Sequence, residues 1–212
     1  MRNLLNIILL IVGFANGFVS KEAFADFKIE KIEDLEVVNQ DGKKVNFYKD
    51  LVKGKRVGIN FIYTTCKMIC LPMSAVFSST AKMLAKEEDS EKYELISVTL
   101  DPENDTPEKL KEYAKKHNRE KGWTLVTGDP DKVRKLLRQL KGFEQNIENH
   151  GAFTVVGNDS TGEWRKVGGI KPPKELYKEM IKLKKNEKVE SISSEKKKEK
   201  KLIGHIFQIQ RF

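Results

Sequence analysis

The chain has 212 residues and a formal net charge of +9, with 40 lysines and arginines against 31 aspartates and glutamates. This length suits one domain with terminal extensions. Much of the positive charge lies between residues 183 and 201, where eight lysines stand against four glutamates, and no basic stripe is interleaved with aromatic residues. Because nucleic-acid-binding domains carry such a stripe, we expect no nucleic-acid partner.

The N-terminus has the pattern of an export signal. Arg2 precedes a largely apolar run from Leu4 to Val19, and Ala23-Phe24-Ala25 places small residues at the two positions that a signal peptidase reads. We predict that residues 1–25 are a signal peptide cleaved after Ala25. The alternative is an uncleaved anchor, although the run falls short of the about 20 residues of a typical membrane span. In either case the domain is exported, and is periplasmic or anchored facing the periplasm.

The first half of the domain predicts a hairpin, a buried strand and a helix. Apolar runs over Phe27–Val38 and Lys44–Phe47 flank the segment Asn39–Lys43, whose Asp-Gly pair is a turn signal. The apolar run Val57–Tyr63 is typical of a buried strand. Pro72–Lys86 follows with apolar residues among small ones, which indicates a helix packed on a sheet.

Strands and helices alternate through the second half. Strands are expected over Tyr93–Leu100 and Trp123–Thr127, followed by an antiparallel pair over Phe153–Val156 and Trp164–Val167. Helices are expected to start at Asp105-Thr106-Pro107-Glu108, at Gly128-Asp129-Pro130 and at Pro172-Pro173, the last running over Lys174–Leu183. This order predicts an α/β sandwich with a central mixed sheet flanked by helices and an N-terminal hairpin extension.

The domain is expected to span residues 26–183, and two further segments follow it. Residues 184–201, rich in lysine, glutamate and serine, predict a disordered linker. Residues 202–212 form an apolar C-terminal segment of unknown role. The lysines would favour contact with an anionic membrane surface, and the alternative is a solvated linker without a partner.

The chain contains only two cysteines, Cys66 and Cys70, and both follow the predicted strand Val57–Tyr63 directly. Placed before a helix, thiols are favoured as thiolates by the helix dipole, and thiolate both exchanges disulfides and binds soft metals. A structural disulfide is the alternative in an oxidising compartment. Since closing a loop of about 5 residues contributes only about 2 kcal/mol, we interpret the pair as reactive or metal-binding.

Further motifs accompany these cysteines. They are the run Asn60–Cys66, the run Ile96-Ser97-Val98 followed by Asp101–Pro107, and His150 just before a predicted strand. Together they resemble the Sco (SenC-like) copper-chaperone family of the thioredoxin-like superfamily, over roughly residues 27–183. The resemblance implies a thioredoxin-like fold.

The resemblance also implies a site and a function. Cys66, Cys70 and His150 would bind one copper ion, with Asp101 and Asp105 beside it. The chain would then be an exported metallochaperone rather than an enzyme, supporting assembly of the copper site of cytochrome c oxidase. Its partner would be the copper-receiving subunit of that oxidase or another exported copper protein.

The residues themselves leave several alternatives open. Thiolates select Cu(I) and an imidazole also allows Cu(II), but two cysteines and a histidine could hold zinc as well. A thiol–disulfide oxidoreductase, with Cys66 attacking and Cys70 resolving, would reduce an exported partner without needing a histidine. Asp105, as the first residue of Asp-x-x-Glu, could instead cap a helix, which contributes about 1 kcal/mol. The chain also departs from the family pattern, because Lys67 and Leu71 occupy positions where proline is usual.

Overall fold

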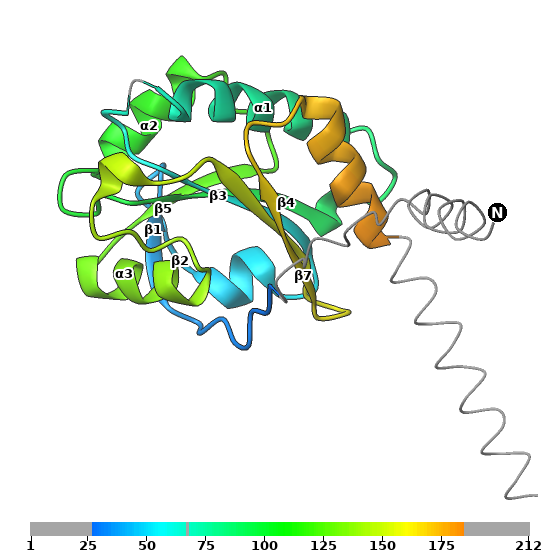
Figure 1. The fold of residues 1–212 in the computed structure, drawn as a ribbon, viewed down its shortest axis with the longest axis horizontal. Helices are drawn as coiled ribbons and strands as arrows, with labels where there is room; N and C mark the ends of the chain where they lie inside the picture. The colour runs from blue at the N-terminus through cyan, green and yellow to red at the C-terminus, as the bar shows by residue number, and fades with distance from the viewer. Residues whose placement is uncertain (1–26, 67, 185–212) are drawn as a thin grey trace, which may run out of the picture.

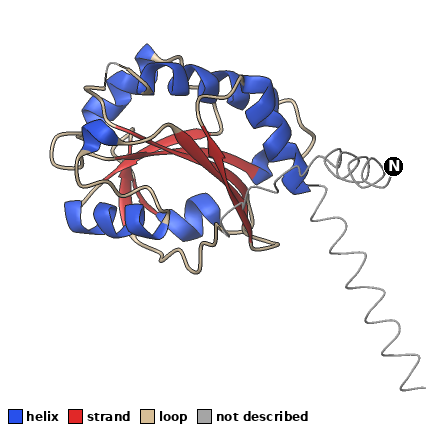
Figure 2. Cartoon of the chain, in the orientation of Figure 1, coloured by secondary structure: helices blue, strands red, loops and turns tan. Residues whose placement is uncertain are grey.

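The structure is a computed structural model that describes residues 27–66 and 68–184 (Figure 1). A seven-stranded sheet with the order β2-β1-β5-β4-β3-β6-β7 forms the middle layer, with helices on both faces (Figure 2). The strands are β1 (Glu36–Asn39), β2 (Lys44–Asn46), β3 (Arg56–Ile62), β4 (Tyr93–Thr99), β5 (Trp123–Thr127), β6 (Phe153–Asn158) and β7 (Glu163–Gly168). The predicted α/β sandwich with a mixed sheet is therefore confirmed.

Helices and short helical turns connect the strands. The α-helices are α1 (Cys70–Leu84), α2 (Pro107–Lys116) and α3 (Pro130–Gln139), and a further helix covers residues 173–184. The shorter turns are the π-helical η3 (Phe47–Val52) and the 3₁₀ turns η4 (Ser90–Lys92) and η5 (Ile147–Asn149). Helix α1 begins at Cys70 rather than at Pro72. The proline is tolerated there because the first N–H groups of a helix have no intrahelical partner.

Strand β3 shows why the central strands are almost continuously apolar. Its seven residues are all buried, because each face of the sheet is covered. Val57, Ile59 and Phe61 point into the core beneath η3 and α3, whereas Ile62 points into the core formed with α1, α2 and helix 173–184. The sheet is therefore enclosed between two apolar cores, one on each face.

The strand directions bring several loops to one edge of the sheet. Strands β3, β4 and β5 are parallel, so the loops that follow β3 and β4 lie side by side. Strand β6 pairs antiparallel with β3, from Arg56 opposite Asn158 to Ile59 opposite Val155. The beginning of β6 therefore lies at the same edge as the end of β3.

The predicted N-terminal hairpin extends the sheet at its far edge. Strands β1 and β2 pair antiparallel, and Val38 of β1 lies opposite Thr127 of β5. Gly42 has a φ of +76°, a left-handed conformation that the tight turn requires and glycine adopts without strain. Strand β1 is shorter than the predicted run, because residues 27–35 form no regular structure although Ile29 and Ile32 are buried.

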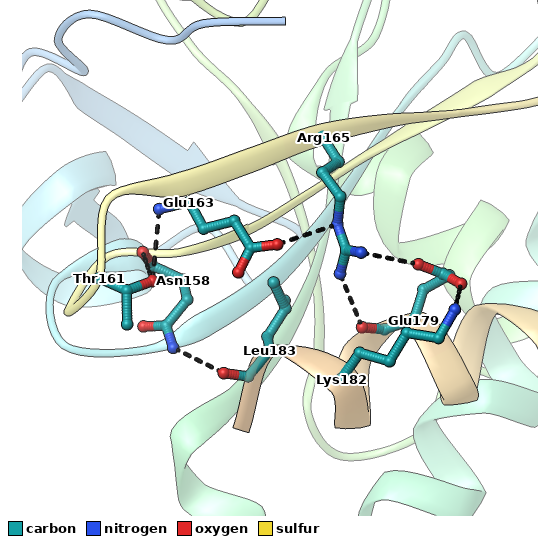
Figure 3. A network of polar contacts seen from close by, with 7 residues as sticks. All are labelled: Asn158, Thr161, Glu163, Arg165, Glu179, Lys182 and Leu183. Atoms are coloured by element: carbon teal, nitrogen blue, oxygen red, sulfur yellow. Dashed lines mark hydrogen bonds and ion pairs between the residues drawn. The ribbon is translucent and has the colours of Figure 1, made fainter. Parts of the chain in front are cut away.

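Helix 173–184 is held against the last hairpin by the polar network of Figure 3. The Asn158 side-chain amide donates a hydrogen bond to the Leu183 carbonyl oxygen at 3.2 Å. The Arg165 guanidinium pairs with Glu179 at 3.2 Å. The helix also packs close to β3, because a Cβ on Gly58 would come within 2.7 Å of Leu95 and 3.3 Å of Met180. A larger residue at Gly58, in the middle of β3, would therefore require the Leu95 and Met180 side chains to move.

No helix within residues 27–66 and 68–184 has the length and apolar character needed to cross a membrane. The expected signal peptide or anchor over residues 1–25 lies outside the described residues. The same is true of Lys67, of residues 202–212, and of the expected linker 184–201 apart from Lys184.

Candidate metal centre

The edge of the sheet where β3 and β4 end and β6 begins holds a cluster of three ligand-type side chains. Cys66 lies in the loop after β3, Cys70 is the first residue of α1, and His150 stands between η5 and β6. The two sulfur atoms and an imidazole nitrogen all lie within 4.8 Å of one another. Cys70 Sγ is 3.8 Å from His150 Nε2. The fold thus brings the three residues predicted as copper ligands together.

All three side chains of this cluster are buried. The exposed fractions are 7% for Cys66, 1% for Cys70 and 7% for His150. The Tyr63 ring packs edge-on against the His150 ring, with the ring centroids 5.5 Å apart. Water is therefore largely excluded from the cluster, which strengthens electrostatic interactions within it.

The two thiols differ in their acidity. Burial by itself raises the pKa of Cys66, but hydrogen bonds from the Cys70 thiol and from the backbone of Cys70 and Met68 outweigh it, so that the pKa is lowered. The Tyr63 hydroxyl gives a further hydrogen bond that acts in the same direction. The pKa of Cys70 is raised, chiefly by burial and then by its hydrogen bond to Cys66. Cys66 is therefore the first of the pair to become a thiolate.

This difference corrects the expectation that the helix N-terminus favours thiolate. Cys70 occupies the first position of α1, yet its pKa is raised. Cys66 lies before the helix and has the lowered pKa. Burial of Cys70 at the start of the helix outweighs the effect of the helix dipole on its pKa, and local hydrogen bonds lower the pKa of Cys66 instead.

His150 is held in the neutral form that a metal ligand needs. Burial lowers its pKa, and the smaller influences of the Gly151 backbone and the Glu144 charge act in the opposite direction. Nε2 faces Cys70, whereas Nδ1 is buried and makes no hydrogen bond of normal geometry within the described part of the chain. A neutral imidazole with Nε2 directed at the thiols is a suitable donor for a soft or borderline metal.

Asp105 is hydrogen-bonded to the start of the loop that carries Cys66. Its side chain, 1% exposed, accepts hydrogen bonds from the Thr64 backbone N–H at 3.1 Å, from the Thr64 hydroxyl at 2.5 Å and from the Thr99 hydroxyl at 2.5 Å. Burial raises the pKa of Asp105, and these hydrogen bonds oppose it. The carboxyl group thereby connects the ends of β3 and β4 directly beneath the loop that carries Cys66.

The capping interpretation of Asp105 is wrong, and Asp101 lies farther from the ligands. The N-cap of α2 is Thr106, whose side chain accepts from the Lys109 backbone N–H at 3.4 Å. Asp101 accepts hydrogen bonds from the Asn104 side-chain amide, and its own backbone N–H donates to the Thr99 hydroxyl at 3.0 Å. Asp101 is thus linked to the site through the Thr99 hydroxyl and through the Asp105 backbone N–H, which donates to the Asp101 carbonyl at 2.8 Å.

Two tyrosines of the site were not among the residues singled out from the sequence. Tyr63 contacts both Cys66 and His150, and it is the last residue of the apolar run Val57–Tyr63, which gave it no separate signal. The Tyr113 hydroxyl on α2 lies 2.7 Å from the Ser74 hydroxyl and donates to the Cys70 carbonyl at 3.3 Å. Tyr113 lies on the buried face of α2, where a tyrosine ordinarily indicates packing only.

A mixed sheet with two cysteines between a central strand and its following helix, faced by a histidine, defines a thioredoxin-like domain with a candidate metal centre. Residues 25–180 match the family model described as SCO1/SenC. The chain therefore belongs to the SCO1/SenC family.

Known proteins agree with this assignment. The chain is 35% identical over 139 residues to a SCO1 protein homolog of Bacillus subtilis (strain 168), covering 61% of this chain and 69% of that protein. BsSco, described as a member of the Sco family of cytochrome c oxidase assembly proteins with a disulfide switch, is 27% identical with a TM-score of 0.59, covering 72% of this chain and 92% of that chain. Arabidopsis thaliana ScoI with copper bound is 18% identical with a TM-score of 0.61, covering 74% of this chain and 99% of that chain. This similarity shows that the two proteins share a fold.

Proposed function

We propose that this protein is an exported copper metallochaperone that binds one copper ion through Cys66, Cys70 and His150. The observation that carries the proposal is the convergence of two sulfur atoms and one imidazole nitrogen within 4.8 Å of one another in a buried cluster. Two thiolates favour Cu(I), and the imidazole allows Cu(II) to be held as well. The copper-bound relative with the same fold supports this choice of metal over zinc.

A three-ligand site suits a carrier. Copper held by Cys66, Cys70 and His150 would keep a position to which a ligand of another protein can add. Because Cys66 becomes a thiolate first, it would be the first protein ligand to bind an arriving ion. Asp105, through Thr64 and Thr99, would hold the loop of Cys66 in place.

The proposed recipient is the copper-receiving subunit of cytochrome c oxidase or another exported copper protein. The description of BsSco as one of the cytochrome c oxidase assembly proteins supports this assignment. Export is supported by Arg2, the apolar run Leu4–Val19 and the small residues before Asp26. The domain would work in the periplasm or facing it, with the lysine-rich segment after Leu183 able to contact an anionic membrane surface.

The test is copper stoichiometry and affinity of the reduced full chain, for the wild type, His150→Ala and Asn149→Ala. We expect one copper per wild-type chain, a weakened Cu(II) affinity in His150→Ala, and no change in Asn149→Ala, whose exposed side chain lies outside the cluster. Binding that is indifferent to His150 would refute the three-ligand site. Preferential binding of zinc over copper would refute the choice of metal.

A thiol–disulfide oxidoreductase is the second candidate, because both cysteines are free and adjacent and the Cys66 pKa is lowered. The Cys66 thiolate would attack a partner disulfide and release one partner thiolate. Cys70, after losing its proton, would then attack the Cys66 sulfur, leaving a Cys66–Cys70 disulfide and a fully reduced partner. The disulfide switch described for BsSco supports this candidate. Full disulfide-reducing activity in His150→Ala, with no copper bound by the wild type, would favour it over the chaperone.

A further inference from the structure

A hollow of about 250 Å³ lies beside Cys66 and is walled on the opposite side by α2. We name it the α2 hollow and define it by Cys66 and the α2-side residues Lys109, Glu112, Lys116 and His117. Lys109, Glu112 and Lys116 are spaced i, i+3 and i+7, so they form one stripe along the helix. This stripe faces the candidate metal centre from outside the cluster.

Cys66 is the one cluster residue that lines the α2 hollow. Cys70, the first residue of α1, is only 1% exposed, and its carbonyl accepts the hydrogen bond of Tyr113. His150 is covered by the Tyr63 ring. A ligand that approaches a bound ion through the hollow therefore meets the Cys66 side of the site first.

The walls of the hollow carry excess positive charge. Lys109 and Lys116 are exposed, and neither forms an ion pair with another residue in the described part of the chain. Glu112 supplies the single carboxylate of the lining. His117 packs against Tyr113 with tilted rings whose centroids are 4.2 Å apart, and an imidazole carries no negative charge that could offset the lysines.

Leu71 adds exposed apolar surface to the same hollow, which it lines, and it is 39% exposed. Met68, in the loop between the two cysteines, is 83% exposed. Exposed large apolar side chains beside a charged rim are typical of a surface that contacts a partner. Lys109 and Lys116 would attract the negative charges of an acidic segment, and the exposed apolar side chains would contact an apolar or sulfur-containing residue of the same segment.

We propose that the α2 hollow is the docking site for an acidic segment of the protein that exchanges copper with this chain, and that this segment brings its sulfur ligand to the Cys66 side of the ion. The proposal rests on the proposed chaperone function. In the exchange, the incoming sulfur would donate an electron pair to copper, and the bond between copper and Cys66 Sγ would then break. The bonds to Cys70 and His150 would break as further ligands of the segment replace them. Cys66 leaves as a thiolate, and the oxidation state of copper does not change.

The test compares removal of Cu(I) from the loaded full chain by two probes. One is the anionic chelator bathocuproine disulfonate, and the other is its uncharged relative neocuproine. The variant is Lys109→Gln with Lys116→Gln, and the matched control is Lys111→Gln with Lys115→Gln, two exposed lysines of the same helix outside the hollow. At low ionic strength we expect the hollow variant to slow removal by the anionic probe about three- to tenfold. Removal by neocuproine and all rates of the control variant should be unchanged.

A second measurement uses peptides in place of chelators. Each peptide carries one cysteine, flanked either by glutamates or by glutamines. The glutamate peptide should accept Cu(I) faster from the wild type than from the hollow variant, and high salt should abolish the difference. Equal rates for the hollow and control variants with both anionic probes would overturn the docking proposal. A wild-type chain that binds no copper would instead overturn the proposed function, so the two failures are distinguishable.

Discussion

Cys70 Sγ lies 3.8 Å from His150 Nε2, although the two residues are 80 positions apart in the chain. The contact exists because β6 runs antiparallel to β3, which places the residue before β6 next to the helix that follows β3. The register of this strand pair therefore determines whether the candidate metal centre forms at all. Substitutions that alter the chemistry of the cluster can be distinguished by experiment from substitutions that destabilise the fold around it.

Removing the Tyr63 hydroxyl should make the Cys66 thiol less acidic. In Tyr63→Phe the ring that packs against His150 stays, but one of the hydrogen bonds that lower the pKa of Cys66 is lost, while those from Cys70 and Met68 remain. We expect the pKa of Cys66 to rise and its alkylation near neutral pH to slow severalfold. The measurement is the pH dependence of alkylation of the copper-free, reduced chain. Tyr48→Phe, which changes a tyrosine bonded to Asp159 instead, is the matched control; the same rate in both variants would contradict the role of Tyr63.

Asp105→Asn should weaken both stability and copper binding. The substitution keeps the shape of the side chain but places an amide among donors from Thr64 and Thr99 that a carboxylate accepts. We expect a loss of about 2 kcal/mol in the free energy of unfolding, because Thr64 and Thr99 donors left without a good acceptor cost more than is gained by no longer burying a carboxylate. Copper affinity should fall with it, because the loop before Cys66 loses its support.

Asp101→Asn provides the comparison for this loop. The Asp101 carboxylate accepts a hydrogen bond from the Asn104 side-chain amide and none from the cysteine loop within the described residues. The free energy of unfolding should therefore change by less than about 0.5 kcal/mol. Urea denaturation and copper competition on both variants make the measurement. Equal effects of the two substitutions would show that Asp105 has no special role in positioning Cys66.

Glu94 should make stability decrease as the pH rises. Burial raises its pKa above the ordinary 4.5, although the Thr124 hydroxyl and Lys55 oppose the shift. The folded state therefore binds the proton more tightly than the unfolded state, and stability present below pH 4.5 is lost as the pH rises through the folded pKa. Glu94→Gln should lack this loss and gain stability relative to the wild type toward neutral pH. Urea denaturation between about pH 4 and pH 7 tests this; parallel curves for the two chains would refute it.

Gly58→Ala should destabilise the fold through overpacking. The added Cβ would lie 2.7 Å from Leu95 and 3.3 Å from Met180, between β3 and helix 173–184. We expect a loss of about 1–3 kcal/mol. Gly168→Ala, in strand β7, meets no atom within 4 Å and should change stability by less than about 0.5 kcal/mol. Thermal unfolding of the two variants is the measurement, and equal melting temperatures would show that the Leu95 and Met180 side chains shift to accept the added Cβ without cost.

Much of the fold followed from local patterns. The strand Trp123–Thr127 and the pair ending in β7 were predicted nearly at their observed bounds, because β-branched and aromatic runs between turn residues are strong local signals. The start of α1 was misplaced by two residues. Proline in a first turn marks the beginning of a helix only approximately, since it is accepted at any position that needs no N–H partner.

The sequence by itself determined the α/β sandwich, the position of two thiols between a strand and a helix, and the motifs that resemble one family, because strand and helix periodicity and residue spacing are local properties. Only the tertiary structure decided the rest. It placed His150 against Cys70 through strand pairing, and it placed Asp105 beneath the cysteine loop instead of at the helix cap that was the alternative interpretation. It also made Cys66 rather than Cys70 the more acidic thiol. These outcomes depend on burial and on partners that are distant in sequence, and no local pattern encodes either of them.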